Sequence, residues 1–199
     1  MIEGPEDIPK TVNRTEAFHR IIPPEEIKYL QGICHSRYIK KNDFFIKQGD
    51  TLSPMAIINK GLFRVYCVDY EGNDKTLAFR KEEQFLSGYT PILKNQPIWY
   101  SIQALEDSLI SYIEFEQYST LLKKNFCWVE LSHHYVIGLF MEKEERERSL
   151  LMDDALTRYR NFTQTFPDYT NRISQYHIAS YLGITPSSLS RIRANSKNN

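Results

Sequence analysis

The chain has 199 residues, in which 25 lysines and arginines balance 25 aspartates and glutamates, so the formal net charge is zero. This length suffices to bury a sizeable core in one or two domains. Three isolated cysteines (Cys34, Cys67 and Cys127) form no CxxC pair, which argues against zinc knuckles and iron–sulfur clusters and is typical of a cytoplasmic protein. The sequence lacks an apolar run of ~18 residues and a signal-peptide profile, so we expect no membrane segment.

The first two thirds of the chain change from a helical to a β pattern. Residues 16–36 are predicted to be helical, with a helix start at Pro23-Pro24-Glu25-Glu26. From about residue 38 to 115, short runs rich in β-branched and aromatic residues alternate with glycine-containing turns. This spacing predicts an antiparallel barrel or sandwich, with the jelly roll favoured. The predicted strands are Phe44–Ile46, Met55–Ile58, Leu62–Val68, Thr76–Phe79, Ser101–Leu105 and Leu109–Phe115.

A long helix is predicted from about residue 117 onward. Apolar and polar residues recur on it at intervals of 3, 4, 3 and 4, as in a coiled coil, at Val129, Ser132, Val136, Leu139 and Lys143. We interpret this stripe as a dimerisation seam, although it could also pack on its own barrel. The charge run that follows, from Glu142 to Arg148, is interpreted as a solvated helix face with Glu142–Arg146 and Glu144–Arg148 pairs.

The C-terminal segment has the spacing of a helix-turn-helix. A helix marked by Met152, Ala155, Tyr159, Phe162 and Phe166 stops at Pro167. In residues 174–193, Gly183 is placed for a tight turn, Thr185 for a helix cap and Pro186 for a first helical position. The apolar positions that predict the two packed helices are Ile178, Ala179, Leu182, Ile184, Leu189 and Ile192. An ordinary pair of amphipathic helices in an all-α core is the alternative interpretation.

Charge is divided unevenly between the two ends of the chain. From residue 155 onward there are six lysines and arginines and one acid, so 6 − 1 = +5, and residues 1–154 carry −5. A basic module joined to an acidic body is typical of a DNA-binding domain. The free face of the second helix carries Ser187, Ser188, Ser190 and Arg191, side chains suited to reading bases in a major groove.

This order of elements resembles the Crp/Fnr superfamily of bacterial transcription regulators, the relatives of the cyclic-AMP receptor protein. The resemblance covers residues 20–195 and is carried by the turns at Gly49-Asp50, Gly61 and Gly72, the helix after them, and the helix-turn-helix at 174–193. It implies an α+β fold: an N-terminal antiparallel β-roll (a jelly roll like a cyclic-nucleotide-binding domain), a long connecting helix and a C-terminal all-α helix-turn-helix domain. The boundaries expected are 1–124, 125–148 and 149–199.

The resemblance further implies a non-enzymatic, sequence-specific transcription regulator that works as a homodimer. Its partners would be double-stranded DNA and a second copy of the chain, with RNA polymerase as a further candidate. Arg191 matches an arginine that commonly reads guanine in the family, whereas Pro186 and Ser187 replace a frequent Arg and Glu, so the familiar half-site is not expected. The DNA-contacting residues implied are Pro186, Ser187, Ser188 and Arg191 for bases, and Thr185, Ser174 and Tyr176 for phosphates.

The β-roll departs from the cyclic-nucleotide pattern. Gly88 is followed by Tyr89 instead of Glu, and residues 95–103 contain neither Arg nor Lys. A buried phosphate without a cationic partner is costly, so we expect no control by cyclic nucleotide. The equivalent site is aromatic and would either bind an apolar or aromatic effector or be filled by its own rings: Phe85, Tyr89, Trp99 and Tyr100.

Two other classes of function remain open. A cupin-type enzyme would need two or three histidines and a carboxylate in the barrel. All five histidines lie outside residues 38–115, and the adjacent His133 and His134 point to different sides of a helix, so no catalytic residue, metal site or cofactor is predicted. The second class is a regulator that has lost DNA binding and docks a protein partner instead.

Overall fold

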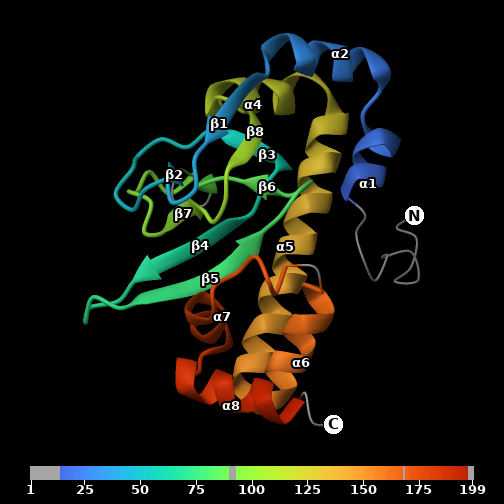
Figure 1. Ribbon diagram of the computed structural model, residues 1–199. Helices are drawn as coiled ribbons and strands as arrows, with labels where there is room; N and C mark the ends of the chain where they lie inside the picture. The colour runs from blue at the N-terminus through green and yellow to red at the C-terminus, as the bar shows by residue number, and fades with distance from the viewer. Residues whose placement is uncertain (1–13, 90–92, 168, 197–199) are drawn as a thin grey trace.

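Two four-stranded antiparallel sheets face each other in the first half of the chain (Figure 1). The computed structural model describes residues 14–89, 93–167 and 169–196. One sheet has the order β1-β8-β3-β6: His35–Ile39, Ser108–Ile113, Met55–Lys60 and Phe85–Leu86. The other has the order β2-β7-β4-β5: Phe44–Ile46, Ser101–Ala104, Phe63–Val68 and Asp74–Arg80. This arrangement confirms the predicted antiparallel β-roll.

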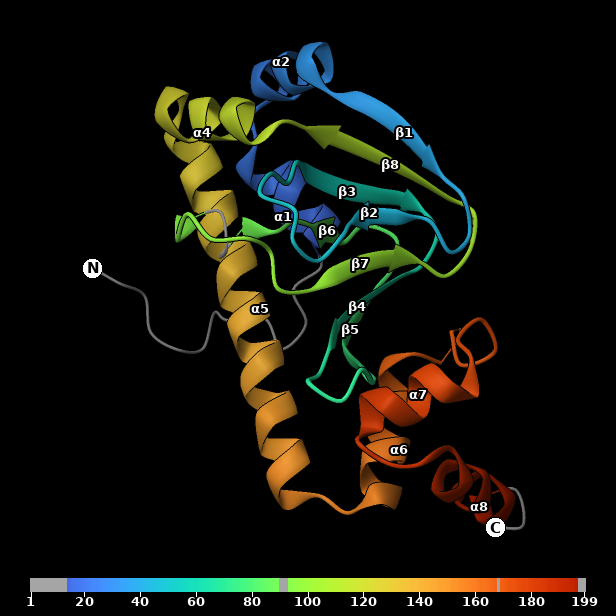
Figure 2. The same cartoon turned by 90° about the vertical axis from the view of Figure 1, so that its left-hand side faces the viewer.

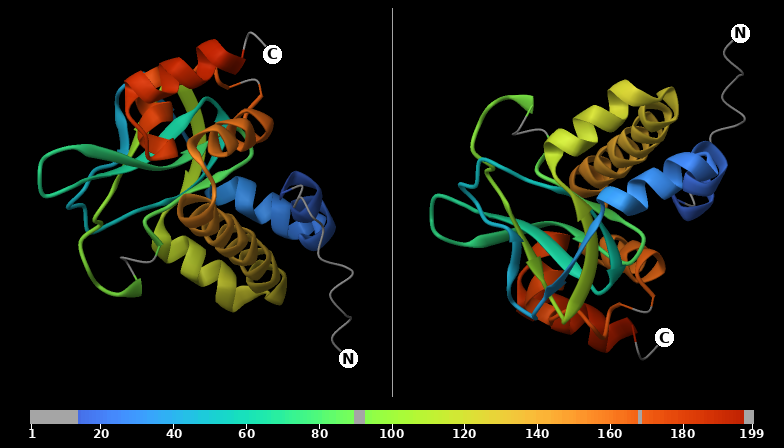
Figure 3. Two further views of the ribbon diagram at one scale, coloured as in Figure 1. Left: turned by 90° about the horizontal axis from the view of Figure 1, so that it is seen from below. Right: turned by 90° about the horizontal axis from the view of Figure 1, so that it is seen from above.

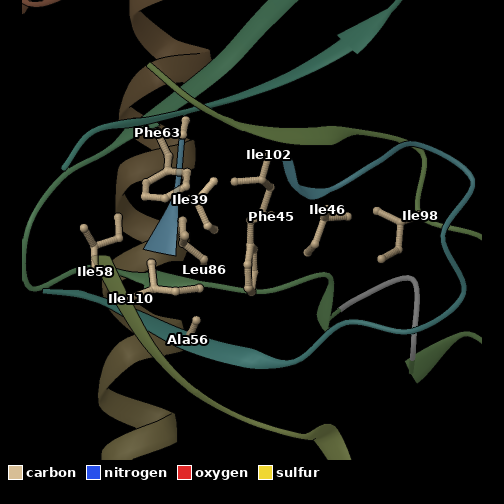
Figure 4. Packing of buried hydrophobic residues seen from close by; sticks show 11 residues of the cluster. Ile39, Phe45, Ile46, Ala56, Ile58, Phe63, Leu86, Ile98, Ile102 and Ile110 are labelled. Atoms are coloured by element: carbon tan, nitrogen blue, oxygen red, sulfur yellow. The ribbon is translucent and has the colours of Figure 1, made fainter. Parts of the chain in front are cut away.

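The space between the sheets is filled by aliphatic and aromatic side chains (Figure 4). Alternate residues of β3 and β7 point inward, and this period of two in the sequence is what predicts such strands. Ile58, Phe63 and Ile110 are almost completely buried at the centre, and Ile98 closes one end of the core. The interior of the roll therefore consists of packed side chains.

Gly61 permits the tight connection between β3 and β4. Its φ of +121° is unfavourable for any residue with a side chain, and an added Cβ would lie 2.1 Å from the Ser108 hydroxyl. The resulting close approach lets the Leu105 amide donate to the Leu62 carbonyl at 2.7 Å. This glycine turn thus joins the two sheets at the end of the roll that faces the C-terminal helices.

Four helices cover the outer face of the β1-β8-β3-β6 sheet. They are α1 (Arg14–Ile21), α2 (Pro24–Ile33), α4 (Phe115–Lys124) and α5 (Phe126–Met152), and the first three lie beside α5 when the molecule is seen along that helix (Figure 3). Buried Glu26 joins α2 to α4 and α5, because its carboxylate accepts bonds from the Trp128 indole (2.9 Å) and the Lys124 amine (3.3 Å). No helix among the described residues is both long and apolar enough to cross a membrane.

The chain turns back after α5 and forms three shorter helices beneath the β-roll (Figure 2). These are α6 (Ala155–Thr165), α7 (Gln175–Leu182) and α8 (Pro186–Ser196). They share one hydrophobic cluster with Leu62, Phe79 and Leu105 of the roll. Phe79 is 1% exposed and packs against the rings of Phe162, Phe166 and Tyr181. Side chains of the roll and of the three helices therefore form one cluster, which is distinct from the core between the sheets.

Several local features differ from the sequence predictions. Strands β1 and β6 are not among the predicted strands, because His35–Ile39 shows no clean alternation and Phe85–Leu86 is only two residues long. The predicted lead-in helix is divided in two where the chain bends at Ile22, and its second part ends at Ile33 instead of residue 36. The connecting helix extends to Met152, beyond the expected residue 148.

Candidate nucleic-acid interface

Helices α7 and α8, joined by a short turn after Gly183, occupy the segment predicted to be a helix-turn-helix. Ser174 caps α7 by accepting a bond from the His177 amide at 3.2 Å, and Gly183 ends it in the left-handed region with φ of +67°. The side chains that hold α8 against α7 are buried as expected: Ile178, Ala179, Leu182 and Leu189. The apolar spacing therefore gives the close helix crossing on which recognition helices depend.

Thr185 organises the N-terminus of α8. Its hydroxyl oxygen accepts a bond from the Ser188 amide at 3.2 Å, which confirms the predicted helix cap. The same oxygen lies 2.9 Å from the hydroxyls of both Ser187 and Ser188. Two of the predicted base-reading hydroxyls are thus linked to the cap, and DNA would have to compete with or extend these bonds.

The outward face of α8 carries short polar side chains and one long cation. Pro186, Ser187, Ser190 and Arg191 are exposed, and Ser188 is half-buried. An exposed guanidinium can donate two parallel bonds to a guanine edge, whereas serine reaches several bases. The structure therefore places the predicted base-reading residues together on one accessible helix face.

The start of α7 offers a second set of donors close to that face. Ser174 and Tyr176 are exposed, as phosphate contacts must be. The unbonded amides and the positive dipole end of a helix N-terminus favour phosphate there. The exposure of Ser174 and Tyr176 is therefore compatible with the phosphate contacts that the resemblance implies, which would position a protein without reading sequence.

The positive charge of the C-terminal segment is only partly available to a partner. Arg172 pairs with Glu106 and, at 3.1 Å, with Glu82, and Arg158 donates to the carbonyls of Leu182 and Asp153. Burial alone would raise the pKa of Glu82, but the Gly61 amide, Tyr169 and Arg172 lower it to about 2. The exposed arginines that remain in the described part of this segment are Arg160 and Arg191, with Arg193 half-buried.

A polar cluster joins α7 to the β-roll, and sequence reasoning missed it. Buried Arg64 of β4 forms an ion pair with Asp74 at 2.9 Å and donates to Nδ1 of His177, also at 2.9 Å. Burial and then the Arg64 charge lower the pKa of His177 to about 4, so the ring is neutral at pH 7 and can accept this bond. The one available signal was an arginine in the alternating pattern of a predicted strand.

A second pair of contacts joins the end of α5 to the same interface. Glu142 pairs with buried Arg80 at 2.7 Å, and Arg146 donates to the carbonyls of Thr76 and Tyr181 while stacking on the Tyr181 ring. The interpretation of this charge run as a solvated face was therefore wrong at both residues, because each one bonds to another element of the fold.

The second predicted pair of the charge run was also wrong. Arg148 pairs with Glu145 at 2.7 Å and with Asp153 at 3.3 Å instead of with Glu144. Asp153 follows the last residue of α5. Arg148 therefore ties the end of the connecting helix to the turn that leads into α6.

The exposed seam of α5 is rotated from the predicted stripe. Val129 and Val136 are exposed as expected, but Ser132 points inward and bonds to the Tyr118 hydroxyl at 2.7 Å, and Leu139 is half-buried. Ser132 therefore lies on the side of α5 that packs against α4, away from the most exposed face of the helix. The residues that do share one exposed face at intervals of 3, 4, 3 and 4 are Phe126, Val129, His133, Val136 and Phe140, which we call the α5 face, and Lys143 continues it.

The four aromatic residues predicted as an effector site do not meet in one pocket. Phe85 packs on Tyr135 of α5, and Tyr89 packs on Phe115 and Tyr118 of α4. Trp99 is 55% exposed, and the Tyr100 hydroxyl donates to the Ser87 carbonyl at 3.0 Å. Of the four, Phe85 lines a cavity that lies under α5 on the outer face of the sheet.

Gly88 and its neighbours are tightly packed at one end of the β-roll. The Gly88 amide donates to the Ser53 hydroxyl at 2.7 Å, and an added Cβ would lie 2.4 Å from the Ile98 side chain. Ile98 itself is 1% exposed. Within the described part of the chain, no group of three or more His, Cys, Asp or Glu residues is placed to hold a metal ion.

Comparisons with known proteins agree with this architecture. Residues 36–125 match the cyclic nucleotide-binding domain family. FixK2 from Bradyrhizobium japonicum has a TM-score of 0.73 at 15% identity, covering 83% of this chain and 85% of its own. The c-di-GMP-responsive global regulator CLP from Xanthomonas campestris has a TM-score of 0.71 at 10% identity, with 88% and 92% covered.

The catabolite activator protein of Thermus thermophilus has a TM-score of 0.58 at 18% identity, covering 92% of this chain and 86% of its own. No curated protein sequence matches the chain. At these identities the structural likeness establishes the fold and leaves the ligand and the operator undetermined. The chain thus has the fold of the Crp/Fnr-type transcription regulators, with a β-roll that matches the cyclic nucleotide-binding domain family.

Proposed function

We propose that this protein is a sequence-specific DNA-binding transcription regulator of the Crp/Fnr type. The observation that carries the proposal is the exposed polar face of α8, which packs on α6 and α7 while α7 packs on β5 of the roll. Arg191 would read a guanine, Ser187, Ser188 and Pro186 would contact neighbouring bases, and Thr185, Ser174 and Tyr176 would contact phosphates. The similar proteins are regulators, which supports a regulatory role and gives no support to an enzyme.

The regulator works as a homodimer joined through the α5 face. Phe126 and Phe140 are 74% and 63% exposed, and they stand in line with two valines at coiled-coil spacing. Contiguous exposed apolar residues of this kind mark interaction surfaces. Pairing two α5 helices would give the two copies of α8 the two-fold symmetry that a palindromic operator requires.

Cyclic nucleotide does not control this regulator. The resemblance puts the ribose of a cyclic nucleotide beside Gly88, where Ser53 and Ile98 pack closely, and residues 95–103 supply no cation to neutralise its phosphate. A charged phosphate in that position would be buried without a partner. The packing of Ser53 and Ile98 on Gly88 thus fills this end of the β-roll with the chain's own side chains.

Replacing Arg191 with alanine should weaken binding at one base position. Sequences selected from random DNA would supply the operator, and fluorescence anisotropy would then measure affinity for it and for single-base variants. We expect a loss of about 1–3 kcal/mol on the selected site, with relaxed preference at the base that Arg191 reads. Affinity should also fall steeply with salt, because phosphate contacts release counterions.

Lys28→Ala is the matched control, because Lys28 is an exposed cation on α2 at the opposite end of the molecule from α8. Equal weakening of all sequences by Arg191→Ala would make Arg191 a phosphate contact. Absence of any binding near ~50 mM salt would contradict the proposal and favour the regulator that docks a protein partner.

Replacing Val136 with glutamate should dissociate the dimer. The substitution puts a charge into the α5 face of each copy, and the two charges would face each other across the seam. We expect the dimer dissociation constant to rise at least ~10-fold, equivalent to about 1.4 kcal/mol. Analytical ultracentrifugation over a concentration series would measure it, with Tyr70→Glu, at a side chain 97% exposed in the β4–β5 turn, as the control. An unchanged constant in Val136→Glu would place the interface elsewhere.

A further inference from the structure

An apolar cavity lies between the outer face of the β1-β8-β3-β6 sheet and the helices that cover it. Its volume is about 90 Å³, and it is partly open to the surface. Each surrounding element contributes to the wall: Phe18 from α1, Leu30 from α2, Met55 from β3, Phe85 from β6, Tyr118 from α4 and Trp128 from α5. It is separate from the interior of the β-roll, where Ile98 and its neighbours fill the space.

The wall of this cavity offers almost nothing to a polar ligand. The Tyr118 and Ser132 hydroxyls bond to each other at 2.7 Å, and the Ser111 hydroxyl accepts a bond from Asn59 at 2.7 Å. Buried Glu26 is not part of the wall, because its carboxylate is occupied by Trp128, Lys124 and Asn125. A water molecule would lack the two to four partners that hold buried water in place.

We propose that this cavity binds a small, uncharged apolar or aromatic molecule. An apolar cavity of ~150 Å³ in another protein stays dry and binds benzene or xenon. A partly open space of about 90 Å³ suits xenon directly, and a benzene-sized ring with its edge toward the opening. Charged metabolites and nucleotides do not match this wall.

The cavity is placed to act on the DNA-binding helices through α5. Trp128, Leu131 and Tyr135 of α5 form one side of the cavity. Farther along the same helix, Glu142 and Arg146 contact Arg80 and Tyr181 at the α7 interface. A bound molecule that stabilises one position of α5 would therefore bias how the helix-turn-helix is held, a consequence that rests on the proposed function.

Trp128 provides a direct measure of binding without DNA. The chain contains two tryptophans, so a Trp99→Phe background leaves only Trp128, which is 4% exposed and lines the cavity. Bromobenzene, an aromatic heavy-atom quencher somewhat larger than benzene, should quench its fluorescence to a plateau. Xenon under pressure should do the same, and both should raise the melting temperature increasingly as their concentration exceeds the dissociation constant.

Leu131→Phe fills the cavity from α5 and should abolish the saturable quenching. Ile57→Phe fills it from β3 and serves as a second, independent variant if the first does not fold. Ile137→Phe is the matched control, since Ile137 is an exposed residue of α5 outside the cavity. Quenching that is linear in probe concentration and equal in all variants, with no thermal stabilisation by either probe, would overturn the proposal.

A final experiment tests ligand binding in the cavity separately from DNA binding. DNA affinity is measured by anisotropy with and without saturating bromobenzene. A change in affinity that is absent in Leu131→Phe would identify the cavity as an effector site. Saturable quenching in a protein that binds no DNA would keep the cavity as a ligand site while rejecting the DNA-binding proposal.

Discussion

Phe79→Ala is expected to destabilise the whole chain by about 3–5 kcal/mol, the cost typical of removing a buried phenylalanine side chain. Phe79 lies on β5, yet its ring contacts Phe162 and Phe166 of the α6 region and Tyr181 of α7, with centroid distances of 5.3–6.1 Å. The substitution would leave a cavity at the point where the β-roll and the helix-turn-helix share their core.

Because the core is shared, wild-type protein should unfold in one cooperative transition, and Phe79→Ala should shift that single transition. Urea denaturation followed by both tryptophan fluorescence and far-UV circular dichroism would test this. Phe126→Ala, at a side chain 74% exposed on α5, is the control and should change monomer stability by less than ~0.5 kcal/mol. Two separate transitions, with only one of them shifted by Phe79→Ala, would show that the helix-turn-helix folds independently.

The sequence predicts those parts of the fold that depend on residues close together in the chain. Gly183, Thr185 and Pro186 each perform their function within four residues of their own position, so the turn and the cap can be read directly. The strands between residues 44 and 113 alternate because each has one face in the core. The two missed strands lack that signal, since the β1 residues other than Ile39 are exposed.

Predictions about charged side chains failed where a partner comes from a distant part of the chain. Glu142 and Arg146 stand four residues apart on one helix, which is enough to predict a solvated pair. In the structure, Arg80 lies 62 residues away in sequence from Glu142 and donates to its carboxylate. Spacing along a helix shows which side chains are neighbours, but it does not show which other elements bind them.

The spacing of residues along α5 likewise does not show which face of the helix is exposed. Two stripes with 3-4 spacing exist on α5, and both contain Val129 and Val136. Only the packing of Tyr118 from α4 against Ser132 decides that the neighbouring stripe, with Phe126 and Phe140, is exposed. The resemblance likewise predicts one shared site for the aromatic residues of the β-roll. The fold separates them, because Phe85 packs on α5 and Tyr89 packs on α4.

Arg64→Met should cost about 2–3 kcal/mol of stability at pH 7.5. Removing one partner of a fully buried ion pair costs ~3–5 kcal/mol because the other charge is left unpaired. Arg64 is 3% exposed, but the Asp74 side chain keeps 23% exposure, so water partly compensates the carboxylate. Methionine keeps much of the length and apolar volume of arginine, so this loss measures chiefly the charge and its hydrogen bonds.

The loss of unfolding free energy in Arg64→Met, relative to wild type, should become smaller as the pH falls, because Arg64 affects the protonation of His177. In the wild type, burial and the Arg64 charge hold the folded-state pKa of His177 at about 4, against an ordinary value of 6.5. Between these values the unfolded chain binds more protons than the folded one, so wild-type stability decreases as pH falls from 6.5 toward 4. Without Arg64, the nearby Asp74 charge raises the pKa of His177, and the folded variant can accept that proton.

We therefore expect urea unfolding to show a smaller difference between wild type and Arg64→Met at pH 5.5 than at pH 7.5. The groups that face His177 across the interface are Arg64 of β4 and Asp74 of β5, so the comparison isolates their charges. Arg37→Met, at an exposed cation of β1, should leave stability unchanged at both values. A deficit that is the same at pH 5.5 and 7.5 would mean that Arg64 stabilises the interface without controlling the protonation of His177, and that the contact between β4 and α7 carries no pH dependence of its own.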